Sequence, residues 1–486
     1  MILINPRSLK FGIFEKYVPL SIPISIGYLA GYLLSHNKKV VVIDEHTSLI
    51  TKDLLAEAVK SLSEPYIFGI TTLTPCVKRS REIIHMIKNL YPASIIVLGG
   101  IHPSVLPEEV LENEEVDFVI RGEAEEILIK FYDAVKNSSD YLNIKGLSFR
   151  QNGKIIHNPC ADFPDLSLMP PFPYHIFEKN LERYNFGFIA SSRGCPYNCI
   201  FCSQRIISGQ SFRYFRSETV ISQIGLLINK YKQTHINFVD DNFTVNKQRI
   251  VELCEEMIKN EFYKTTTFDC QTRADAVNDE IFKILRKAGF RVVNFGIETA
   301  SERLMVLLNK KETVRENIEA VKLAKKHGFG VSGTFIFGLP TETKQERWLS
   351  YKLAKELDLD YVRFNNATPY PGTQLYEIAK KEGRLFVQKD WSNLNACGSL
   401  VQDSITDSEL PYVPLGCEEK ILKKDIIKAN LFFSLRPVRI IKLLFKRIGP
   451  AGWFYLPPRW YLKPKEWFDL VCLGFKLIRA LVKIYL

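Results

Sequence analysis

The sequence predicts a multidomain α/β protein built from two successive parallel β/α units. Three observations favour this fold class. The chain has 486 residues and 46% hydrophobic content, which is more than one ordinary core needs. Short apolar strand candidates alternate with helical segments in both halves of the chain. A Pro-rich stretch, "NPCADFPDLSLMPPFPYHIF" (158–177), separates the two series, and we expect an extended linker there because prolines disfavour both helix and strand.

The first unit shows five strand candidates with helices such as 77–90 between them. They are "MILIN" (1–5), "KVVVIDE" (39–45), "YIFGITT" (66–72), "SIIVLGG" (94–100) and "VDFVIRG" (116–122). The segment 17–37 contains no Lys, Arg, Asp or Glu and could be mistaken for a membrane span. Prolines and glycines interrupt it, so we expect a loop followed by a buried helix instead.

The second unit shows six strand candidates, again separated by helical segments. They are "FGFIASS" (186–192), "HINFVDD" (235–241), "TTFDCQT" (266–272), "RVVNFGIE" (291–298), "GVSGTFIFG" (330–338) and "DYVRFNN" (360–366). Strands that alternate with helices in this way predict a second parallel sheet. Polar or Gly-containing turns follow several of these strands, where α/β folds bind their ligands.

Three cysteines lie within eight residues of "SSRGCPYNCIFCSQ" (191–204), at positions 195, 199 and 202. Three thiolates can hold three irons of a 4Fe-4S cluster and leave the fourth iron open to a small molecule. Structural zinc would need a fourth ligand, and the nearest histidine, His175, lies twenty residues upstream. Three inert core cysteines are the remaining alternative, for which a loop after a strand is a poor place. The other seven cysteines form no close pair.

This stretch resembles the cluster-binding motif of radical S-adenosylmethionine (radical SAM) enzymes. Three later segments, "FVDDNFT", "NFGIETAS" and "GTFIFGLPTET", match the same family in order over residues 185–375. The resemblance implies that the catalytic metal ligands are Cys195, Cys199 and Cys202, and that Phe201 packs beside the adenine. It further implies contacts to the methionine amino group from Asp240, Asp241 and Asn242, to the ribose or methionine part from Glu298 and Ser301, and to the adenine from Gly338 and Pro340.

The first unit resembles the cobalamin-binding domain that precedes the radical domain in a large subgroup of these enzymes. The matching stretches are "NPR…PISIGYLAGYL", "FGITTLT", "VLGGIHPSVLPEEVL" and "VDFVIRGEAEE". No Asp-x-His-x-x-Gly motif for cobalt ligation occurs. A domain kept as an empty scaffold is the alternative. The resemblance implies that the cofactor tail lies on Gly99 and Gly100, that the lower corrin face meets Thr71, Thr72 and Thr74, and that His102 is a tail contact rather than a cobalt ligand.

The family resemblance thus sets the expected domain order. We expect a Rossmann-like cobalamin-binding domain over 1–142 and a Pro-rich linker over 143–184. A partial (β/α)6 radical SAM barrel, a partial TIM barrel, is expected over 185–400. A mostly helical, basic C-terminal region is expected over 401–486.

The C-terminal region carries the net charge of the chain. Residues 421–486 hold fourteen Lys and Arg against three Asp and Glu, an excess that equals the +11 of the whole chain. Apolar residues recur there at helical intervals among the basic ones, with Trp453, Trp460 and Trp467. Such helices suit an anionic membrane surface or a hydrophobic substrate, or they pack on the barrel with a solvated charged face. No recognisable RNA module accompanies them, so nucleic-acid binding is not expected.

The expected function follows from the implied cofactors, a 4Fe-4S cluster, S-adenosylmethionine and cobalamin. Reductive cleavage of S-adenosylmethionine gives a 5′-deoxyadenosyl radical, and we expect methylation of an unactivated carbon of a hydrophobic lipid, tetrapyrrole or secondary metabolite. Non-methylating rearrangement, cyclisation or oxidation on the same cofactors is one alternative. A non-catalytic cobalamin or nucleotide sensor is the other. The expected partners are a small hydrophobic substrate and a reductant such as flavodoxin or ferredoxin.

The cysteine usage bears on the compartment. Ten scattered cysteines and an opening "MILINPRSLK" without a charged-then-apolar leader favour a reducing cytoplasm. Peripheral contact with the inner face of the membrane through the C-terminal region stays open.

Overall fold

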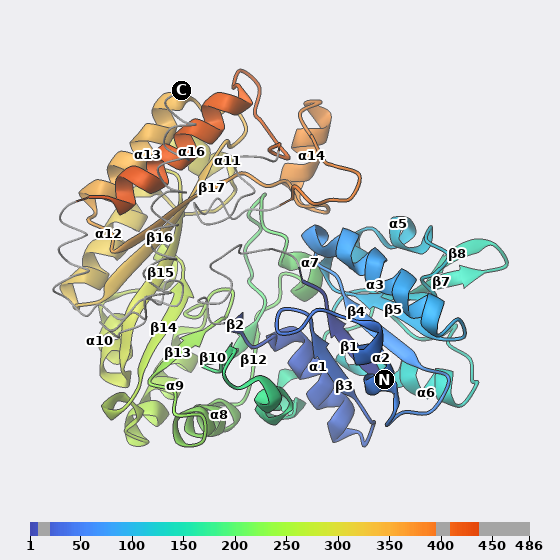
Figure 1. Ribbon diagram of the computed structural model, residues 1–486. Helices are drawn as coiled ribbons and strands as arrows, with labels where there is room; N and C mark the ends of the chain where they lie inside the picture. Colours follow the sequence, from blue (N-terminus) through green and yellow to red (C-terminus); the bar gives the residue numbers. More distant parts are fainter. Residues whose placement is uncertain (8–19, 395–408, 437–486) are drawn as a thin grey trace, which may run out of the picture.

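The computed structural model describes residues 1–7, 20–394 and 409–436, and its two β/α bodies lie side by side (Figure 1). The N-terminal body is a seven-stranded sheet, and the second body is a six-stranded parallel sheet flanked by helices. The two predicted parallel units are therefore confirmed. The basic helices predicted beyond residue 436 lie outside the described residues.

The first sheet contains all five strands predicted for the N-terminal unit. Its spatial order is β3 (Val41–Asp44), β1 (Ile2–Asn5), β4 (Ile67–Thr71), β5 (Ile95–Gly99), β6 (Phe118–Ile120), β7 (Leu147–Gln151) and β8 (Lys154–His157). The first five strands pair in parallel. Both faces are buried, as β1 shows: Ile2 and Ile4 pack on one side and Leu3 on the other.

Helices cover the two faces of this sheet. One layer contains α1 (Ile24–Ser35) and α6 (Glu125–Lys136), which share a core with Leu3. The opposite layer contains α2 (Lys52–Val59), α3 (Val77–Leu90) and α5 (Pro107–Leu111). The short α4 (Ile101–Val105) and the 3-10 turn η2 (Thr74–Cys76) follow β5 and β4 at their carboxyl ends. The helix expected in 17–37 is confirmed by α1, and the strand β2 (Leu20–Ser21) precedes it where a loop was expected.

The hairpin β7–β8 was not predicted, because it falls in the segment interpreted as linker (143–184). β7 pairs antiparallel with β6 and extends the first sheet. Its alternating pattern is short, and a Pro-rich stretch follows at once, so local sequence gave little sign of the pairing. The rest of the segment contains the 3-10 turns η3 (Leu166–Leu168) and η4 (Tyr174–Asn180) and then β9 (Tyr184–Asn185), which pairs with β2 (Leu20–Ser21).

The second sheet contains the six strands predicted for the barrel. Its order is β10 (Phe188–Ile189), β13 (His235–Phe238), β14 (Thr267–Thr272), β15 (Phe290–Glu298), β16 (Gly330–Phe337) and β17 (Tyr361–Asn366). Every neighbouring pair is parallel. The sheet order follows the chain order, as in a barrel wound in one direction, and it places the carboxyl ends of the strands on one rim.

Amphipathic helices cover the outside of this sheet. They are α8 (Ser217–Asn229), α9 (Lys247–Lys259), α10 (Asp279–Ala288), α11 (Glu302–Leu307), α12 (Val314–Lys326) and α13 (Lys344–Glu356). Two of them begin with a capping box, Thr313 with Glu316 in α12 and Thr343 with Glu346 in α13. Each box satisfies two backbone donors at the helix start, a contribution of about 1 kcal/mol.

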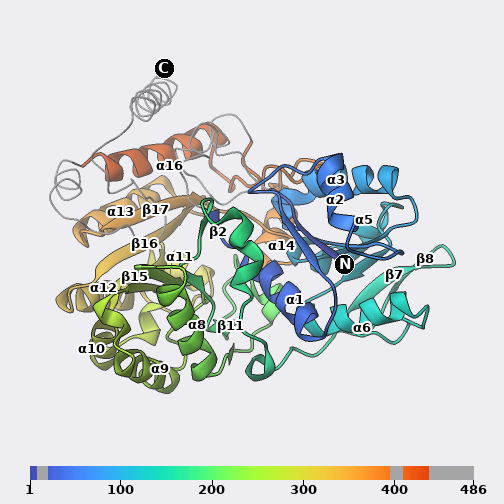
Figure 2. The same cartoon turned by 60° about the horizontal axis from the view of Figure 1, so that its bottom comes forward.

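The C-terminal helix α16 (Glu419–Ser434) covers the open edge of the partial barrel, lying across β17 and α13 (Figure 2). The Asn430 side chain accepts from the Phe364 backbone N–H at 3.2 Å and donates to its carbonyl at 2.8 Å. The Asn430 amide thus satisfies the backbone N–H and carbonyl of an edge-strand residue, which a neighbouring strand would otherwise bond. Asp425 binds the buried Arg347 of α13 at 3.0 Å, which fixes α16 to the barrel.

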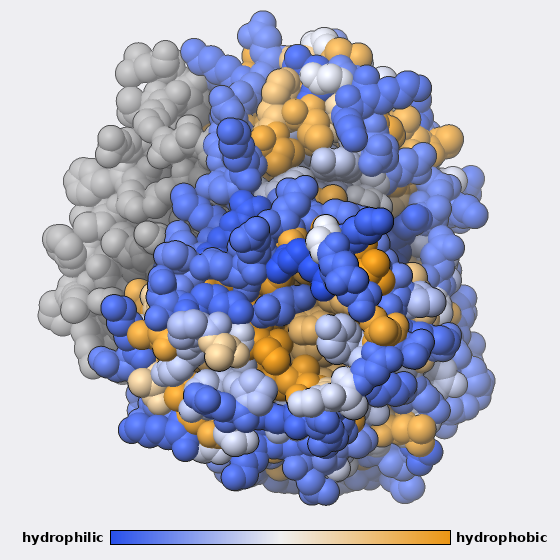
Figure 3. Space-filling model, turned by 90° about the vertical axis from the view of Figure 1, so that its right-hand side faces the viewer, coloured by the Kyte–Doolittle hydropathy of each residue, from blue (hydrophilic) through white to orange (hydrophobic). Residues whose placement is uncertain are grey.

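The molecular surface shows the polarity expected for a globular chain. Figure 3 shows that polar side chains cover most of the side that carries the N-terminal body, with apolar side chains gathered in patches between them. Among the helices of residues 1–7, 20–394 and 409–436, none is long and apolar enough to cross a membrane.

Candidate functional site

The cysteine loop begins directly after the short strand β11 (Ser192–Arg193), which pairs with β12 (Arg213–Tyr214). Gly194 starts the loop with φ +85°, and its N–H donates to the Asp241 carboxylate at 3.0 Å. A Cβ at this position would lie 2.0 Å from the Ser211 carbonyl oxygen. Only glycine fits both the backbone conformation and the space, so the Gly before the first cysteine is a steric requirement.

We expect Gly194→Ala to cost about 2–4 kcal/mol of folding free energy, because positive φ and a backbone clash act together. Urea unfolding and the iron content of the purified protein measure this effect. Gly153→Ala is the matched control, since its φ is +74° but nothing lies within 4 Å of the added carbon. The control is expected to lose only about 1 kcal/mol. Equal losses in the two variants would contradict the steric explanation.

The loop is held in place from its apolar side. Ile200 is buried against Leu304, Leu339 and Leu375, with Phe201 packed beside this cluster. The Ile200 N–H donates to the Leu308 carbonyl at 3.1 Å, and its carbonyl accepts from Leu375 at 2.9 Å. Ile200 and Phe201 thus anchor the loop and leave the flanking cysteines free to face a ligand.

Cys195, Cys199 and Cys202 are all half-buried and form no disulfide. Burial raises the pKa of each thiol, that of Cys199 to about 11, so these cysteines need a bound cation to become thiolates. No group of three His, Cys, Asp or Glu side chains in the described ranges converges on a single metal ion. A 4Fe-4S cluster does not need such convergence, because each thiolate binds a different iron. Three uncrosslinked thiols on one short loop fit that group.

A cavity of about 230 Å³ opens beside the loop at the carboxyl ends of β14 to β17. It brings together two residues that the sequence assigned to S-adenosylmethionine, Phe201 and Glu298. The other polar residues that line it are Gln271, Asn294, Thr334, Asn365, Asn366, Thr368 and Tyr370.

Glu298 is the carboxylate of this cavity and occupies a strained position. Its φ is +64°, and its side chain lies 3.7 Å from the buried ammonium of Lys310. Burial raises the pKa of Glu298, while Lys310 opposes that rise. Lys310 also donates to the Gly296 carbonyl and binds Glu312 at 2.9 Å. A cavity with amide and hydroxyl walls and one carboxylate can accept the ammonium and hydroxyl donors of a small nucleoside.

The three residues after β13 face different neighbours. Asp240 is buried and accepts from the N–H and hydroxyl of Ser191 at 3.1 and 2.7 Å, so it supports the strand that leads to the cysteines. Asp241 accepts from Gly194 and lines the cavity between the two bodies. Asn242 is buried, accepts from Thr272 at 3.2 Å, and its amide nitrogen has no partner among the described residues.

Ser301, Gly338 and Pro340 do not line the cavity of Phe201 and Glu298. Ser301 caps α11 and donates to Glu346 at 2.7 Å. Gly338 has φ +81°, and a Cβ there would lie 2.7 Å from Leu422 of α16. The missing side chain therefore makes room for the C-terminal helix, a contact that sequence alone did not indicate.

The Gly338 turn also contains a buried carboxyl, Glu342, which accepts from the Gly338 N–H at 2.5 Å. Burial raises the pKa of Glu342 to about 8. The folded protein therefore holds this proton more tightly than the unfolded chain. Stability from this group is present below about pH 4.5 and is lost as pH rises towards 8, by up to about 1.4 kcal/mol per pH unit.

We expect Glu342→Gln to flatten the stability profile between pH 5 and 8, measured by urea unfolding at several pH values. Glu346→Gln is the matched control in the same segment. The pKa of Glu346 is lowered to about 2, because its bonds to Arg303 and Thr343 outweigh burial, so its titration lies outside this window. An unchanged slope in Glu342→Gln would contradict the assignment.

A second cavity, of about 360 Å³, lies between the two bodies at the carboxyl ends of the N-terminal strands. Of the residues assigned to cobalamin, Thr71, Gly99 and Gly100 line it. Gly100 has φ +100°, and a Cβ there would lie 3.1 Å from the Thr72 backbone, so glycine is needed for this turn. The opposite wall is Asp241 with Gln204 and Ser208 at α7 (Arg205–Ser208), which directly follows the cysteines. Its apolar walls and glycine turn fit part of a corrinoid cofactor.

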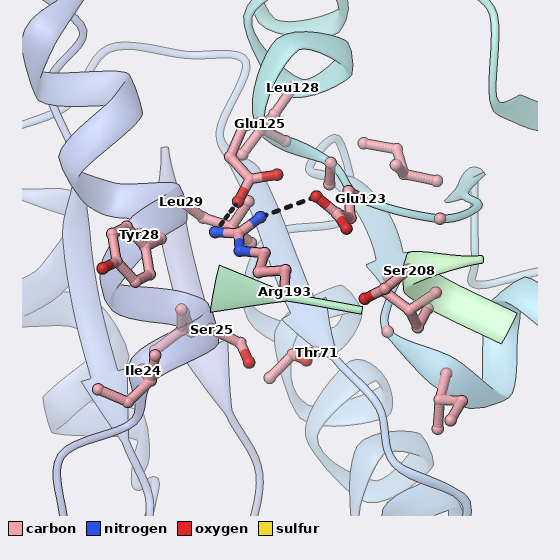
Figure 4. A pocket seen from close by; sticks show the side chains of 18 of the residues that line it. Ile24, Ser25, Tyr28, Leu29, Thr71, Glu123, Glu125, Leu128, Arg193 and Ser208 are labelled. Atoms are coloured by element: carbon pink, nitrogen blue, oxygen red, sulfur yellow. Dashed lines mark hydrogen bonds and ion pairs between the residues drawn. The ribbon is translucent and has the colours of Figure 1, made fainter. Parts of the chain in front are cut away.

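Arg193 is the main residue of this cavity that sequence reasoning missed. Its guanidinium binds Glu123 at 2.9 Å and Glu125 at 2.7 Å, and both carboxylates come from the N-terminal body (Figure 4). It also lies over the Tyr28 ring, 5.1 Å from the centroid. Arg213 contacts Glu123 as well. The "GEAEE" acids and the arginine before the glycine were visible in the sequence, but only tertiary structure shows that they meet.

Thr72, Thr74 and His102 are buried in the N-terminal body and do not line the cavity. Thr72 meets Ser80 at 3.1 Å. The His102 ring packs edge-on against Trp391, with centroids 5.2 Å apart, and burial lowers the pKa of His102 to about 4. The structure thus places His102 at a contact between the two bodies.

A C-x3-C-x2-C loop on a six-stranded partial barrel, facing a Rossmann-like body across a shared cavity, defines a cobalamin-dependent radical SAM enzyme. The Radical SAM superfamily profile matches residues 189–354, and the B12 binding domain profile matches residues 13–131. A methyltransferase of Pyrococcus horikoshii, itself uncharacterised, is 32% identical over 437 residues, 88% of this chain and 91% of that protein. The chain belongs to the cobalamin-binding radical SAM family, and its cofactors are a 4Fe-4S cluster, S-adenosylmethionine and cobalamin.

Two further similarities bear on the architecture. The anaerobic magnesium-protoporphyrin IX monomethyl ester cyclase of Cereibacter sphaeroides is 30% identical over 389 residues, 77% of this chain and 62% of that protein. The solved structure of the radical S-adenosylmethionine methyltransferase TsrM of Kitasatospora setae, with cobalamin and a [4Fe-4S] cluster bound, superposes with a TM-score of 0.71 at 18% identity. It covers 90% of this chain and 91% of that one, and it shows the shared fold.

Proposed function

We propose that this enzyme transfers a methyl group to an unactivated carbon of a hydrophobic small molecule. The observation that carries the proposal is the shared cavity between the two bodies. Thr71 and Gly99 of the N-terminal sheet face Asp241 and α7 of the barrel across it. A corrinoid there would lie next to the cysteine loop, where a substrate radical could accept methyl. The bound cofactors supply reductive cleavage of S-adenosylmethionine and methyl transfer.

In this proposal the chain's own residues bind and orient the cofactors. Cys195, Cys199 and Cys202 hold the cluster, and Phe201 and Glu298 contact S-adenosylmethionine in the barrel cavity. Asp241 ties the cysteine loop to the carboxyl end of β13 through Gly194. The paired charges of Arg193, Glu123 and Glu125 close the seam between the bodies and exclude water from it.

The cyclase named above supports a hydrophobic substrate, since a protoporphyrin ester is largely apolar. The cyclase also makes ring closure the second candidate reaction on the same cofactors.

The test is an anaerobic assay of the reconstituted holoenzyme. Protein loaded with iron, sulfide and cobalamin receives a flavodoxin or chemical reductant, methyl-labelled S-adenosylmethionine, and either a lipid or a porphyrin extract. We expect 5′-deoxyadenosine, S-adenosylhomocysteine and a labelled apolar product. Formation of 5′-deoxyadenosine without S-adenosylhomocysteine would support ring closure or oxidation instead. If fully loaded protein forms neither nucleoside, the proposal is overturned and a sensor is favoured.

A further inference from the structure

An arginine to which the sequence assigned no role points at the cysteine loop. Arg273 follows β14, and its side chain is only 8% exposed. Its Nη1 lies 3.9 Å from the Cys199 Sγ, within the range of an N–H···S hydrogen bond. Its guanidinium stacks on the Tyr197 ring, 3.4 Å from the centroid. A cation thus reaches one of the three thiols from the barrel wall.

Three further hydrogen bonds fix the guanidinium in this orientation. Asp275 accepts from Nε and Nη2, both at 3.0 Å, and the Lys310 carbonyl accepts from Nη2 at 2.6 Å. The Tyr197 hydroxyl donates to the same Asp275 carboxylate at 2.9 Å. Asp275 therefore holds both the arginine and the ring on which it stacks. Such a planar fork, bonded at three nitrogens, has little freedom to turn away from the sulfur.

Two carboxylates share the charge of Arg273, so its effect on the sulfur comes mainly through the N–H that it donates to Cys199. Asp275 balances one positive charge, while Glu312 is shared between Arg273, at 3.5 Å, and Lys310, at 2.9 Å. Lys310 in turn reaches Glu298 of the barrel cavity at 3.7 Å. The network therefore runs from the cysteine loop to the carboxylate proposed to contact S-adenosylmethionine.

We propose that Arg273 is a positioning residue that raises the reduction potential of the cluster through its hydrogen bond to Cys199. This inference rests on the proposed role of Cys199 as a cluster ligand. A reduced cluster carries one more negative charge than the oxidised one, so a nearby cation and N–H donor favour the reduced state. Asp275 and Tyr197 maintain that donor at the sulfur.

The test is an EPR-monitored redox titration of Arg273→Met in reconstituted holoenzyme with full iron content. Methionine keeps much of the apolar stem and removes the charge and the donors. We expect the equilibrium constant for cluster reduction to fall about tenfold, which is a shift of about 59 mV for a one-electron couple. Arg291→Met is the matched control. Arg291 is a partly buried arginine at the start of β15, whereas Arg273 follows the end of the neighbouring parallel strand β14. Among its described contacts, Arg291 bonds only backbone carbonyls.

An unchanged or higher potential in Arg273→Met with full iron would overturn the proposal. If Arg273→Met assembles no cluster, a measurement on the wild-type protein tests the proposal instead. Pulsed EPR of the reduced cluster in protein labelled with guanidino-¹⁵N arginine is expected to show coupling to one arginine nitrogen, and absence of coupling would overturn the proposal. The variant Cys199→Ala separates failure of this proposal from failure of the ligand assignment. If Cys199 is not a cluster ligand, that variant retains the iron content of the wild type.

Discussion

Replacement of Cys199 by alanine is expected to abolish S-adenosylmethionine cleavage and to remove the bound cluster. Three thiolates hold three of the four irons, so the loss of one leaves two irons without protein ligands. 5′-Deoxyadenosine formation should fall to the background rate, and the iron and sulfide content should fall well below that of the reconstituted wild type. Iron analysis, the visible absorption band and nucleoside chromatography measure these effects.

Cys254→Ala is the matched control for this experiment. Cys254 is a residue of α9 and is fully buried in the barrel core. Burial raises the pKa of its thiol, so it behaves as a small apolar side chain. We expect it to keep the cluster and lose only about 1 kcal/mol of stability. A cluster retained at full iron content in Cys199→Ala would contradict the ligand assignment.

Glu123→Ala is expected to weaken both folding and cobalamin retention. This carboxylate is 4% exposed and forms ion pairs with Arg193 and Arg213 of the second body. Removing it leaves the partly buried guanidinium of Arg213 without a carboxylate, while Arg193 keeps Glu125; such a loss costs about 3–5 kcal/mol in comparable buried pairs. Urea unfolding, hydrogen exchange at the seam, and cobalamin retained after gel filtration measure the effect.

Two variants show whether burial causes that loss. Glu57→Ala removes a carboxylate from the Lys60 pair, in which both side chains are 69% exposed, and should cost less than about 1 kcal/mol. Glu123→Gln keeps the size of the side chain and removes its charge, so we expect an intermediate loss. Wild-type stability and cobalamin retention in Glu123→Ala would show that the seam does not depend on this network.

Much of the fold could be predicted because the strands are short, apolar and regularly separated by helices. Segments such as "IIVLG" in β5 and "GVSGTFIF" in β16 show this pattern without any tertiary information. The hairpin β7–β8 could not be predicted in the same way. Its place beside β6 depends on pairing with a distant strand, and its own sequence alternates only briefly.

The site was predictable where the chemistry is local in sequence. The three cysteines, the glycine before them and the apolar pair Ile200 and Phe201 lie within nine residues. The sequence did not predict the neighbours of Ser301 and Gly338. In the structure, Ser301 caps a helix and Gly338 makes room for Leu422. A sequence pattern gives position along the chain but not which neighbour a residue faces.

The sequence by itself determined the two parallel β/α units through its strand periodicity, and its resemblance to a known family determined the class of the protein, its cofactors and the order of its domains. Both could be found without the structure because motifs and periodicity are properties of neighbouring residues. Only the tertiary structure decided how the two bodies meet and which distant residues contact each other within the barrel. The contacts of Arg193 with Glu123, of Arg273 with Cys199 and of Asp425 with Arg347 join residues 70 to 78 positions apart. Such contacts depend on burial and on the docking of whole elements, which no local pattern encodes.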